Sequence, residues 1–104
     1  MSNVANDFLD SLQQDVKDKI ISNVDKVANG FVDKEIFKKI VGTDIWEFRT
    51  KYKGMQYRLL AFWDTRVNTI VVATHGFTKK KQKTPAKEIA KAENIMKQYF
   101  ELNK

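Results

Sequence analysis

Residues 46–64, WEFRTKYKGMQYRLLAFWD, decide the fold of this chain. In residues 46–51 aromatic or small side chains alternate with charged ones, a period of two that is typical of a β-strand. Residues 53–55 then favour a hairpin turn, and a more apolar run follows over residues 57–63. We therefore predict two antiparallel strands joined by a tight turn, with the second strand nearer the centre of a sheet.

The pattern continues on the C-terminal side of this stretch. Residues 64–68 favour a second turn, and residues 69–75 predict a third strand because β-branched side chains dominate them. Pro85 suits the first position of a helix, where its missing N–H costs nothing, and Thr84 is predicted to cap that helix. The apolar stripe of this helix consists of Ile89, Ala92, Ile95, Met96 and Tyr99. Three successive strands and a helix indicate an antiparallel meander with a helix packed on it.

The first quarter of the chain predicts helix. Over residues 6–29 apolar side chains recur at steps of three and four. These side chains are Phe8, Leu12, Val16, Ile20, Val24 and Val27. Asn6 can cap the start and Gly30 can end the helix in a left-handed conformation, and so long a run leaves open a break near residues 13–15. Residues 34–41, KEIFKKIV, predict a further short helix.

At 104 residues the chain is expected to form one domain, residues 1–104, of the α+β class. We predict N-terminal helices packed on a small antiparallel sheet of three to four strands, with a C-terminal helix. No apolar run approaches the roughly 20 residues of a membrane-spanning helix, and the first residues lack the features of a secretory signal. The chain has no cysteine and one histidine, so we expect neither a disulfide nor a transition-metal site, and we expect a cytoplasmic location.

Charge is unevenly distributed along the chain. Residues 1–45 hold six Lys or Arg and eight Asp or Glu, a balance of −2, whereas residues 46–104 hold thirteen and five, a balance of +8; together they give the net charge of +6. Such a basic half favours a polyanionic partner, which can be a nucleic acid, an anionic membrane or an acidic protein. The alternative is that the lysines only keep a small domain soluble.

The hairpin strands carry the first candidate site residues. Arg49 and Lys51 share a face of their strand with Glu47, because alternate side chains of a strand point the same way. Arg58 lies in a strand that is apolar on both faces, so its guanidinium needs a partner or a ligand. Glu47 and Asp64 are its candidate internal partners, and a phosphate group is the ligand that a pair of arginines favours.

Residues 74–85, THGFTKKKQKTP, supply further candidates. His75 is a candidate acid or base for phosphate chemistry, because histidine is the side chain whose unperturbed pKa lies nearest neutrality. Phe77 can stack on an exposed base, and a lysine cluster adds positive charge. The lysines of this cluster are Lys79, Lys80, Lys81 and Lys83. Alternatively, the histidine is structural, Phe77 belongs to the core and the lysines form a solvated connection from strand to helix.

The chain lacks several motifs of catalytic sites. It has no glycine-rich phosphate loop, no HExxH, no GxSxG and no cluster of acids that would hold magnesium. Any cleavage of a phosphodiester is therefore expected to depend on cations and one imidazole, without a metal ion.

Two runs of this sequence resemble a known family. They are WEFRTKYKGMQYRLLAFW at 46–63 and HGFTKKKQKTPAKEIAKAE at 75–93. They are similar to the HigB-like, phage-related branch of the RelE/ParE toxin superfamily, and the likeness extends over residues 7–100. The positions that match the pattern are Glu47, Arg49, Gly54, Tyr57, Arg58, residues 75–80, Thr84, Pro85, Glu88, Ile89 and Ala92.

The resemblance implies a RelE-like fold and the toxin of a type II toxin–antitoxin system. Such toxins are ribosome-dependent endoribonucleases that cut mRNA and inhibit translation without a metal or other cofactor. The implied partners are the ribosome, mRNA and a cognate antitoxin, which in this branch is often a helix-turn-helix DNA-binding protein; no membrane is involved. The positions expected to be catalytic are Arg58, His75 and Lys79. Those expected to bind RNA are Arg49, Lys51, Lys53, Phe77, Lys80, Lys81 and Lys83.

Two other functions remain open at this point. A shared fold does not fix function, and ParE-type members of the superfamily inhibit DNA gyrase without cutting RNA. A basic module that binds RNA without catalysis is the third reading, because the chain has a single histidine and no acidic cluster and so offers few side chains for catalysis.

Overall fold

The computed structural model describes residues 3–31, 33–79 and 84–103. Within these residues the chain forms three helices and one four-stranded sheet. The elements are α1 (Asn3–Asp10), α2 (Gln14–Ala28), β1 (Phe37–Lys39), β2 (Trp46–Tyr52), β3 (Met55–Asp64), β4 (Thr69–Lys79) and α3 (Ala86–Leu102). None of these helices is long and apolar enough to cross a membrane.

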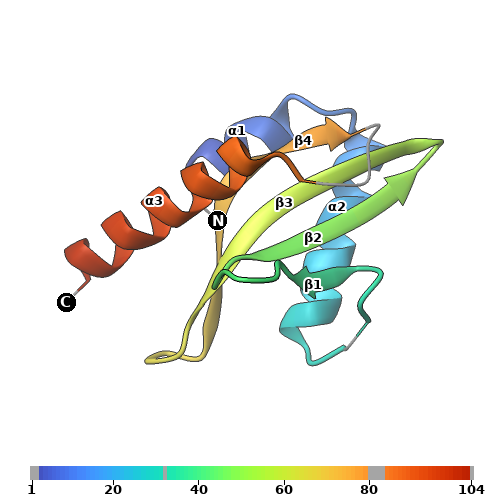
Figure 1. Ribbon diagram of the computed structural model, residues 1–104. Helices are drawn as coiled ribbons and strands as arrows, with labels where there is room; N and C mark the ends of the chain where they lie inside the picture. The colour runs from blue at the N-terminus through green and yellow to red at the C-terminus, as the bar shows by residue number, and fades with distance from the viewer. Residues whose placement is uncertain (1–2, 32, 80–83, 104) are drawn as a thin grey trace.

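The sheet is an antiparallel meander in the order β1-β2-β3-β4. Figure 1 shows that α1 and α2 lie against one face of the twisted sheet and that α3 crosses the other face. This confirms the predicted α+β class, with helices on both sides of a small sheet.

The hairpin between β2 and β3 forms where the sequence predicted it. Lys53 and Gly54 are its two turn residues, with φ of 50° and 79°. Two successive residues with positive φ make the turn whose twist matches that of antiparallel strands, and glycine adopts this conformation without strain. The turn sets the register of the hairpin, in which Arg49 lies directly opposite Arg58.

The prediction of a short helix over residues 34–41 is wrong. Residues 37–39 instead form β1 and pair with residues 46–48 of β2. The ring of Phe37 stacks on Trp46 at 4.8 Å and lies 4.4 Å from the ring of Phe48. An eight-residue helix is marginal without tertiary packing, so the aromatic contacts and the strand pairing decide the conformation here.

The helical region before the sheet is two helices, as the long run had left open. The break lies at residues 11–13, slightly before the predicted position, and the Ser11 hydroxyl there donates to the carbonyl of Phe8. Asn6 lies inside α1, so the prediction that it caps the helix is wrong. Gly30 follows the end of α2 with φ of 92°, which confirms the predicted stop.

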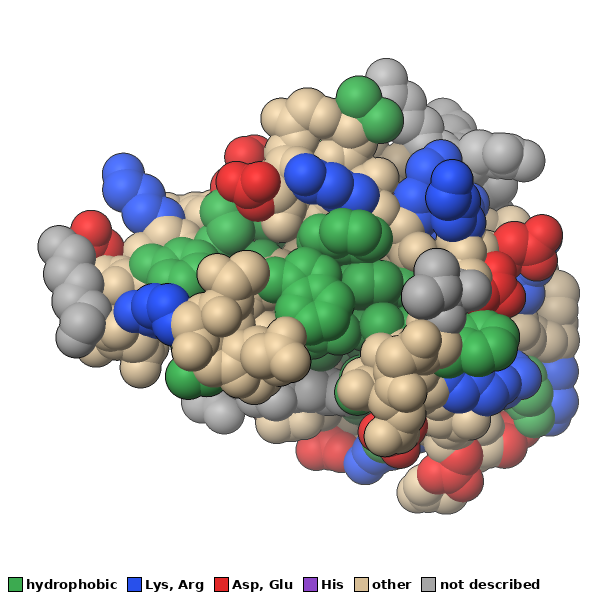
Figure 2. Space-filling view, turned by 90° about the horizontal axis from the view of Figure 1, so that it is seen from below, with side chains coloured by type: hydrophobic (Ala, Val, Ile, Leu, Met, Phe, Trp, Pro, Cys, Tyr) green, Lys and Arg blue, Asp and Glu red, His purple; other side chains and the backbone are tan. Residues whose placement is uncertain are grey.

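Two clusters of buried side chains form the core, one on each face of the sheet. Between the sheet and α1 and α2 lie Ala5, Leu9, Val16, Ile20, Val27, Phe48, Leu59, Ala61 and Val72. On the face of α3 lie Ile45, Leu60, Phe62 and Ala92. Each large apolar side chain stabilises the fold by about 1.5–3 kcal/mol through burial. Figure 2 shows hydrophobic side chains near the middle of the face seen from below, with both basic and acidic side chains around them.

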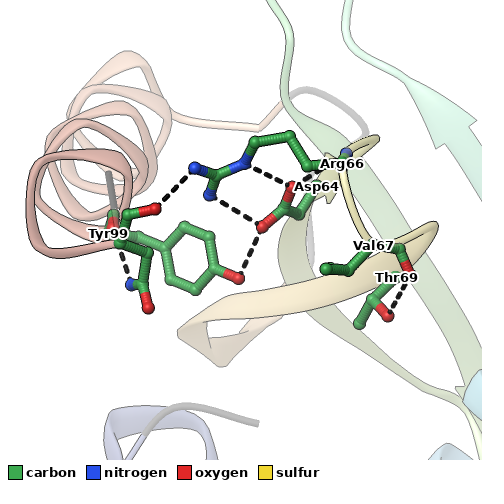
Figure 3. A network of polar contacts seen from close by, with 6 residues as sticks. Asp64, Arg66, Val67, Thr69 and Tyr99 are labelled. Carbon is green, nitrogen blue, oxygen red and sulfur yellow. Dashed lines mark hydrogen bonds and ion pairs between the residues drawn. The ribbon is translucent and has the colours of Figure 1, made fainter.

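A polar network fastens α3 to the turn between β3 and β4 (Figure 3). The buried carboxylate of Asp64 accepts two hydrogen bonds at 3.0 Å from the guanidinium of Arg66 and one at 2.8 Å from the hydroxyl of Tyr99. Arg66 and then Tyr99 lower the pKa of Asp64 from 3.8 to about 2. Arg66 also donates to the carbonyl of Asn103 at the end of α3, so the last turns of this helix are tied to the sheet.

Candidate functional site

Three charged side chains meet on the face of the sheet that α3 partly covers. Glu47 and Arg49 lie on β2, and Arg58 lies opposite Arg49 on β3, so all three point to the same side. This is the side on which Leu60 and Phe62 pack beneath α3. The hairpin register therefore brings together Arg49 and Arg58, which the sequence had marked as a pair of phosphate-binding residues.

The carboxylate of Glu47 is the centre of this group. Its Oε1 lies 2.9 Å from Nη1 of Arg58 and 3.4 Å from Nε of Arg49. Its Oε2 accepts a hydrogen bond from the hydroxyl of Thr84, which lies before α3. A second hydrogen bond, of 2.7 Å, runs from Nη2 of Arg58 to the side-chain carbonyl of Gln56. Arg58 thus has an internal partner, and that partner is Glu47 rather than Asp64.

The two arginines differ in their exposure. The side chain of Arg58 is 2% exposed, whereas that of Arg49 is 31% exposed. Burial lowers the pKa of the Arg58 guanidinium, and the negative charge of Glu47 opposes this shift. An arginine nevertheless stays charged near neutral pH, so the site holds two guanidinium groups against one carboxylate. The exposed cation of the pair is Arg49.

One nitrogen of the buried guanidinium has no hydrogen-bond partner among the described residues. Nε of Arg58 is buried and makes no hydrogen bond to any described atom. Most buried polar groups in proteins are paired, so this nitrogen is an exception among the described residues.

Two hollows meet at Arg49. The larger, of about 390 Å³, lies at the outer edge of β2, between α2, the segment before β1 and the β2–β3 hairpin, and takes in residues of both faces of the sheet. Its lining residues are Lys19, Asn23, Lys26, Asp33, Glu35, Ile36, Arg49, Thr50, Lys51, Gln56 and Arg58. The smaller, of about 210 Å³, lies between β1, β2 and the start of α3. It is lined by Lys38, Lys39, Ile40, Val41, Glu47, Arg49, Thr84 and Ile89.

The other predicted residues of the hairpin lie in different surroundings. Lys51 is exposed on β2 and belongs to the larger hollow. Lys53 lies at the tip of the hairpin and lines neither hollow. Its ammonium group is 2.8 Å from the carboxylate of Asp15 on α2, and this contact lowers the pKa of Asp15. The structure therefore brings Lys51 to the arginine pair and does not bring Lys53 there.

The predicted residues of β4 lie on the strand next to Arg58. In the register of β3 and β4, Phe77 is opposite Arg58 and Lys79 is opposite Gln56. His75 lies where the register shifts, between the Arg58–Phe77 and Leu60–Thr74 pairs. The strand runs to Lys79, four residues beyond the predicted end at His75. The side chains of His75, Phe77 and Lys79 lie outside the described part of the structure, as do residues Lys80, Lys81 and Lys83 altogether.

Thr84 has a role other than the predicted one. The residue at the cap position of α3 is Pro85, in an extended conformation and without a side-chain cap, so the prediction that Thr84 caps the helix is wrong. Its side chain is turned to Glu47, 37 residues away in the chain. A local pattern contains no signal for a partner at that separation. The same holds for Lys19, Asn23 and Lys26 of α2, which no pattern in the sequence connected with the arginines.

The described residues contain no group of three or more His, Cys, Asp or Glu placed to hold a metal ion. The chain was compared with family models, curated proteins and solved structures. Residues 7–97 fit a family model described as "Phage derived protein Gp49-like (DUF891)". No curated protein and no solved structure matches the chain.

Proposed function

The chain belongs to the Gp49-like family of phage-derived proteins, a family of RelE/HigB-like toxins, and on this premise we propose that it is a metal-independent, ribosome-dependent mRNA endonuclease. In this function it is the toxin of a type II toxin–antitoxin system and inhibits translation. The observation that carries the proposal is the pairing of Arg49 with Arg58 around Glu47, beside the part of β4 that holds Phe77 and Lys79.

The chemistry requires a phosphate to be held while a proton moves at each side of it. The 2′-oxygen of the RNA attacks the neighbouring phosphorus and loses its proton to a base. The bond from phosphorus to the 5′-oxygen breaks, and that oxygen takes a proton from an acid. The products are a 2′,3′-cyclic phosphate and a 5′-hydroxyl. Negative charge builds on the phosphoryl oxygens in between, where fixed cations lower the barrier.

We assign these tasks to the residues of the arginine pair and of β4. Arg49, the exposed cation, contacts the phosphate, and Arg58 adds positive charge from beneath it. His75 transfers a proton, and Lys79 and Lys80 stabilise the developing charge. Lys51 contacts the RNA backbone from the larger hollow. Glu47 holds both guanidinium groups in place, so the site is ordered before RNA arrives.

The proposed partners follow from the same function. A toxin of this family has a cognate antitoxin, and we propose that it is a helix-turn-helix protein that binds DNA. The ribosome and mRNA are the proposed targets, and the cytoplasm is the proposed location.

The proposal is tested by inducing the full chain in a bacterial host and mapping mRNA ends. Wild type is expected to arrest growth and to cut mRNA during translation. Arg49→Ala is expected to reduce cleavage about 100-fold or more, because one preorganised charge contact to the reacting phosphate is lost. Lys97→Ala removes one exposed positive charge from α3, outside both hollows, and is the matched control.

Other outcomes decide against the proposal. Growth arrest with DNA damage and intact mRNA supports the gyrase-inhibitor reading. Salt-sensitive RNA binding without toxicity or cleavage supports the non-catalytic RNA-binding module. Equal cleavage by wild type and Arg49→Ala contradicts the assignment of the arginine pair.

A further inference from the structure

The larger hollow, which we call the α2 groove, is a continuous extension of the arginine pair. It is lined on the α3 face of the sheet by Arg49, Lys51 and Arg58 and on the other face by Lys19 and Lys26 of α2, so it passes round the outer edge of β2. We propose that the α2 groove binds phosphodiester groups of the same RNA strand, next to the phosphate that is cut. This rests on the proposed function, and it adds α2 to the RNA-binding surface.

The charge of the groove supports an anionic ligand. Among the described residues, five cationic side chains line it, against the two carboxylates of Asp33 and Glu35. Neither Lys19 nor Lys26 forms an ion pair with another described residue. Cations that are free of internal partners are available to an incoming polyanion, whose binding releases condensed counterions.

The helix presents its lysines as a set. Lys19, Asn23 and Lys26 are separated by four and three residues and so lie along one side of α2. Asn23 faces the sheet, where its amide donates a hydrogen bond of 3.0 Å to the hydroxyl of Thr50 on β2. This buried bond fixes the side of α2 that is turned toward β2. The lysines one turn before and one turn after it therefore stand at the rim of the groove.

The floor of the groove is polar rather than apolar. Its buried lining side chains are Asn23 and Thr50 on the α2 face of the sheet and Arg58 on the α3 face, which are 4%, 3% and 2% exposed. A ligand for such a floor must carry hydrogen-bond acceptors, which phosphate oxygens and ribose hydroxyls provide.

The groove is open because β1 is short. β1 pairs with β2 only at residues 46–48, and the N–H of Arg49 then donates to the carbonyl of Ile36. Beyond this point no described strand covers the outer edge of β2, so Thr50 and Lys51 border the groove directly. A strand of RNA whose phosphate lies at Arg49 can therefore continue past Lys51 toward α2 without crossing another element.

The shared position of Arg49 favours RNA over an acidic peptide. Arg49 lines both the α2 groove and the smaller hollow beside Glu47 and Thr84. A ligand with regularly spaced anionic groups can fill both hollows and place one of these groups at Arg49. An acidic peptide has no such requirement for continuity with the cleavage site.

The experiment measures binding of the full chain to a single-stranded RNA oligonucleotide at several salt concentrations. The test variant is Lys19→Gln with Lys26→Gln, and the control is Lys87→Gln with Lys97→Gln on exposed positions of α3. The test variant is expected to bind more weakly, and its slope of log K against log salt is expected to be shallower by about 1.4, or 0.7 for each lost contact. The control is expected to keep the slope of wild type. Far-UV circular dichroism and thermal unfolding of all variants verify that the fold is retained.

A substitution that removes a negative charge from the groove tests the same inference with the opposite expected effect on binding. Glu35 is exposed at the groove and Glu35→Gln removes a repelling charge, so this variant is expected to bind RNA more tightly than wild type. Asp33 is left in place because its carboxylate accepts the N–H of Glu35 in the loop.

The outcomes separate the groove from the proposed cleavage activity. A wild-type slope for the lysine variant, in a protein that still cuts mRNA, overturns the groove and leaves the proposed function intact. A shallower slope for the lysine variant, when wild type itself cuts no mRNA, supports the groove and rejects the endonuclease. If the lysine variant keeps RNA binding and loses only binding of an oligo-glutamate peptide, the groove is a site for acidic peptides and our inference is wrong.

Discussion

The guanidinium of Arg58 lies 2.9 Å from the carboxylate of Glu47, and both side chains are buried between the sheet and the start of α3. Arg58 therefore has two roles, which measurements of activity alone cannot separate. Its guanidinium supplies charge to the candidate site, and it neutralises the buried carboxylate of Glu47. Loss of activity on replacing Arg58 is therefore informative only together with a measurement of stability.

Arg58→Ala is expected to lower the free energy of unfolding by about 3–5 kcal/mol, because it leaves the charge of Glu47 buried with the longer ion pair to Arg49 and the hydrogen bond from Thr84 as its remaining contacts. Urea unfolding measures this loss. Replacing both partners, with Glu47→Leu and Arg58→Met together, is expected to restore stability to near the wild-type value, since no buried charge then remains unpaired. Equal instability of the single and double variants would contradict this explanation.

Thr84→Asp distinguishes the observed role of Thr84 from that of a helix cap. Aspartate is a good cap, so a capping residue would tolerate the change. Because the hydroxyl of Thr84 donates to Glu47, the added carboxylate instead faces a buried negative charge. We expect a loss of about 1–3 kcal/mol in chemical denaturation. Thr84→Ser keeps the hydroxyl and is expected to keep most of the stability; equal stability of both variants would show that the contact with Glu47 is unimportant.

The network around Asp64 predicts a decline of stability in acid. The pKa of Asp64 is about 2 in the folded chain, below its ordinary value of 3.8, so the folded state favours the carboxylate. The resulting stabilisation is complete above the ordinary pKa and is lost as the pH falls from about 4 through 2. Unfolding curves between pH 5 and 2 measure this. Asp64→Asn is expected to be less stable at pH 5 and to show a flatter dependence on pH.

A matched replacement tests whether the effect belongs to this network. Asp15 also has a lowered pKa, owing first to its contact with Lys53, yet that contact is exposed at the hairpin tip. Asp15→Asn is therefore expected to leave most of the acid dependence in place. An equal flattening by both variants would argue against a special contribution of Asp64.

Gly54→Ala is expected to destabilise the hairpin by about 1–2 kcal/mol through the backbone alone. Gly54 has φ of 79°, and no atom beyond its two chain neighbours lies within 4 Å of the place where a β-carbon would stand, so crowding does not contribute. Thermal unfolding measures the change. Gly54→Asn is the control, because asparagine tolerates the left-handed conformation better than alanine. If both variants unfold alike, conformational strain at this turn is not the cause.

The sequence predicts the centre of this fold well because its signals there are local. A pattern of only a few residues is enough to predict the alternating strand, the turn at residues 53–55 and the β-branched strand at residues 69–75. Residues 34–41 contain no such local signal. Their conformation depends on the aromatic rings of Trp46 and Phe48, which become neighbours only after the hairpin has formed.

The candidate site likewise combines contacts that local sequence patterns predict with contacts that they do not. The pairing of Arg49 with Arg58 follows from the hairpin register, and the need of Arg58 for a partner follows from its apolar strand. The contacts of Thr84 with Glu47 and of Asn23 with Thr50 join elements that are distant in the sequence. Only packing of the helices on the sheet creates them, so no pattern of spacing reveals them.

Helix α3 is attached to the sheet near both of its ends. Thr84, just before the helix, binds Glu47 on β2, and Tyr99, in its last turns, binds Asp64 at the end of β3. A helix held in this way cannot fray from one end without losing a buried contact. Its slowest amide protons should therefore exchange with solvent at the same rate as those of the central strands, as members of one cooperative unit. Local opening of α3 and loss of order around Glu47 are then a single event.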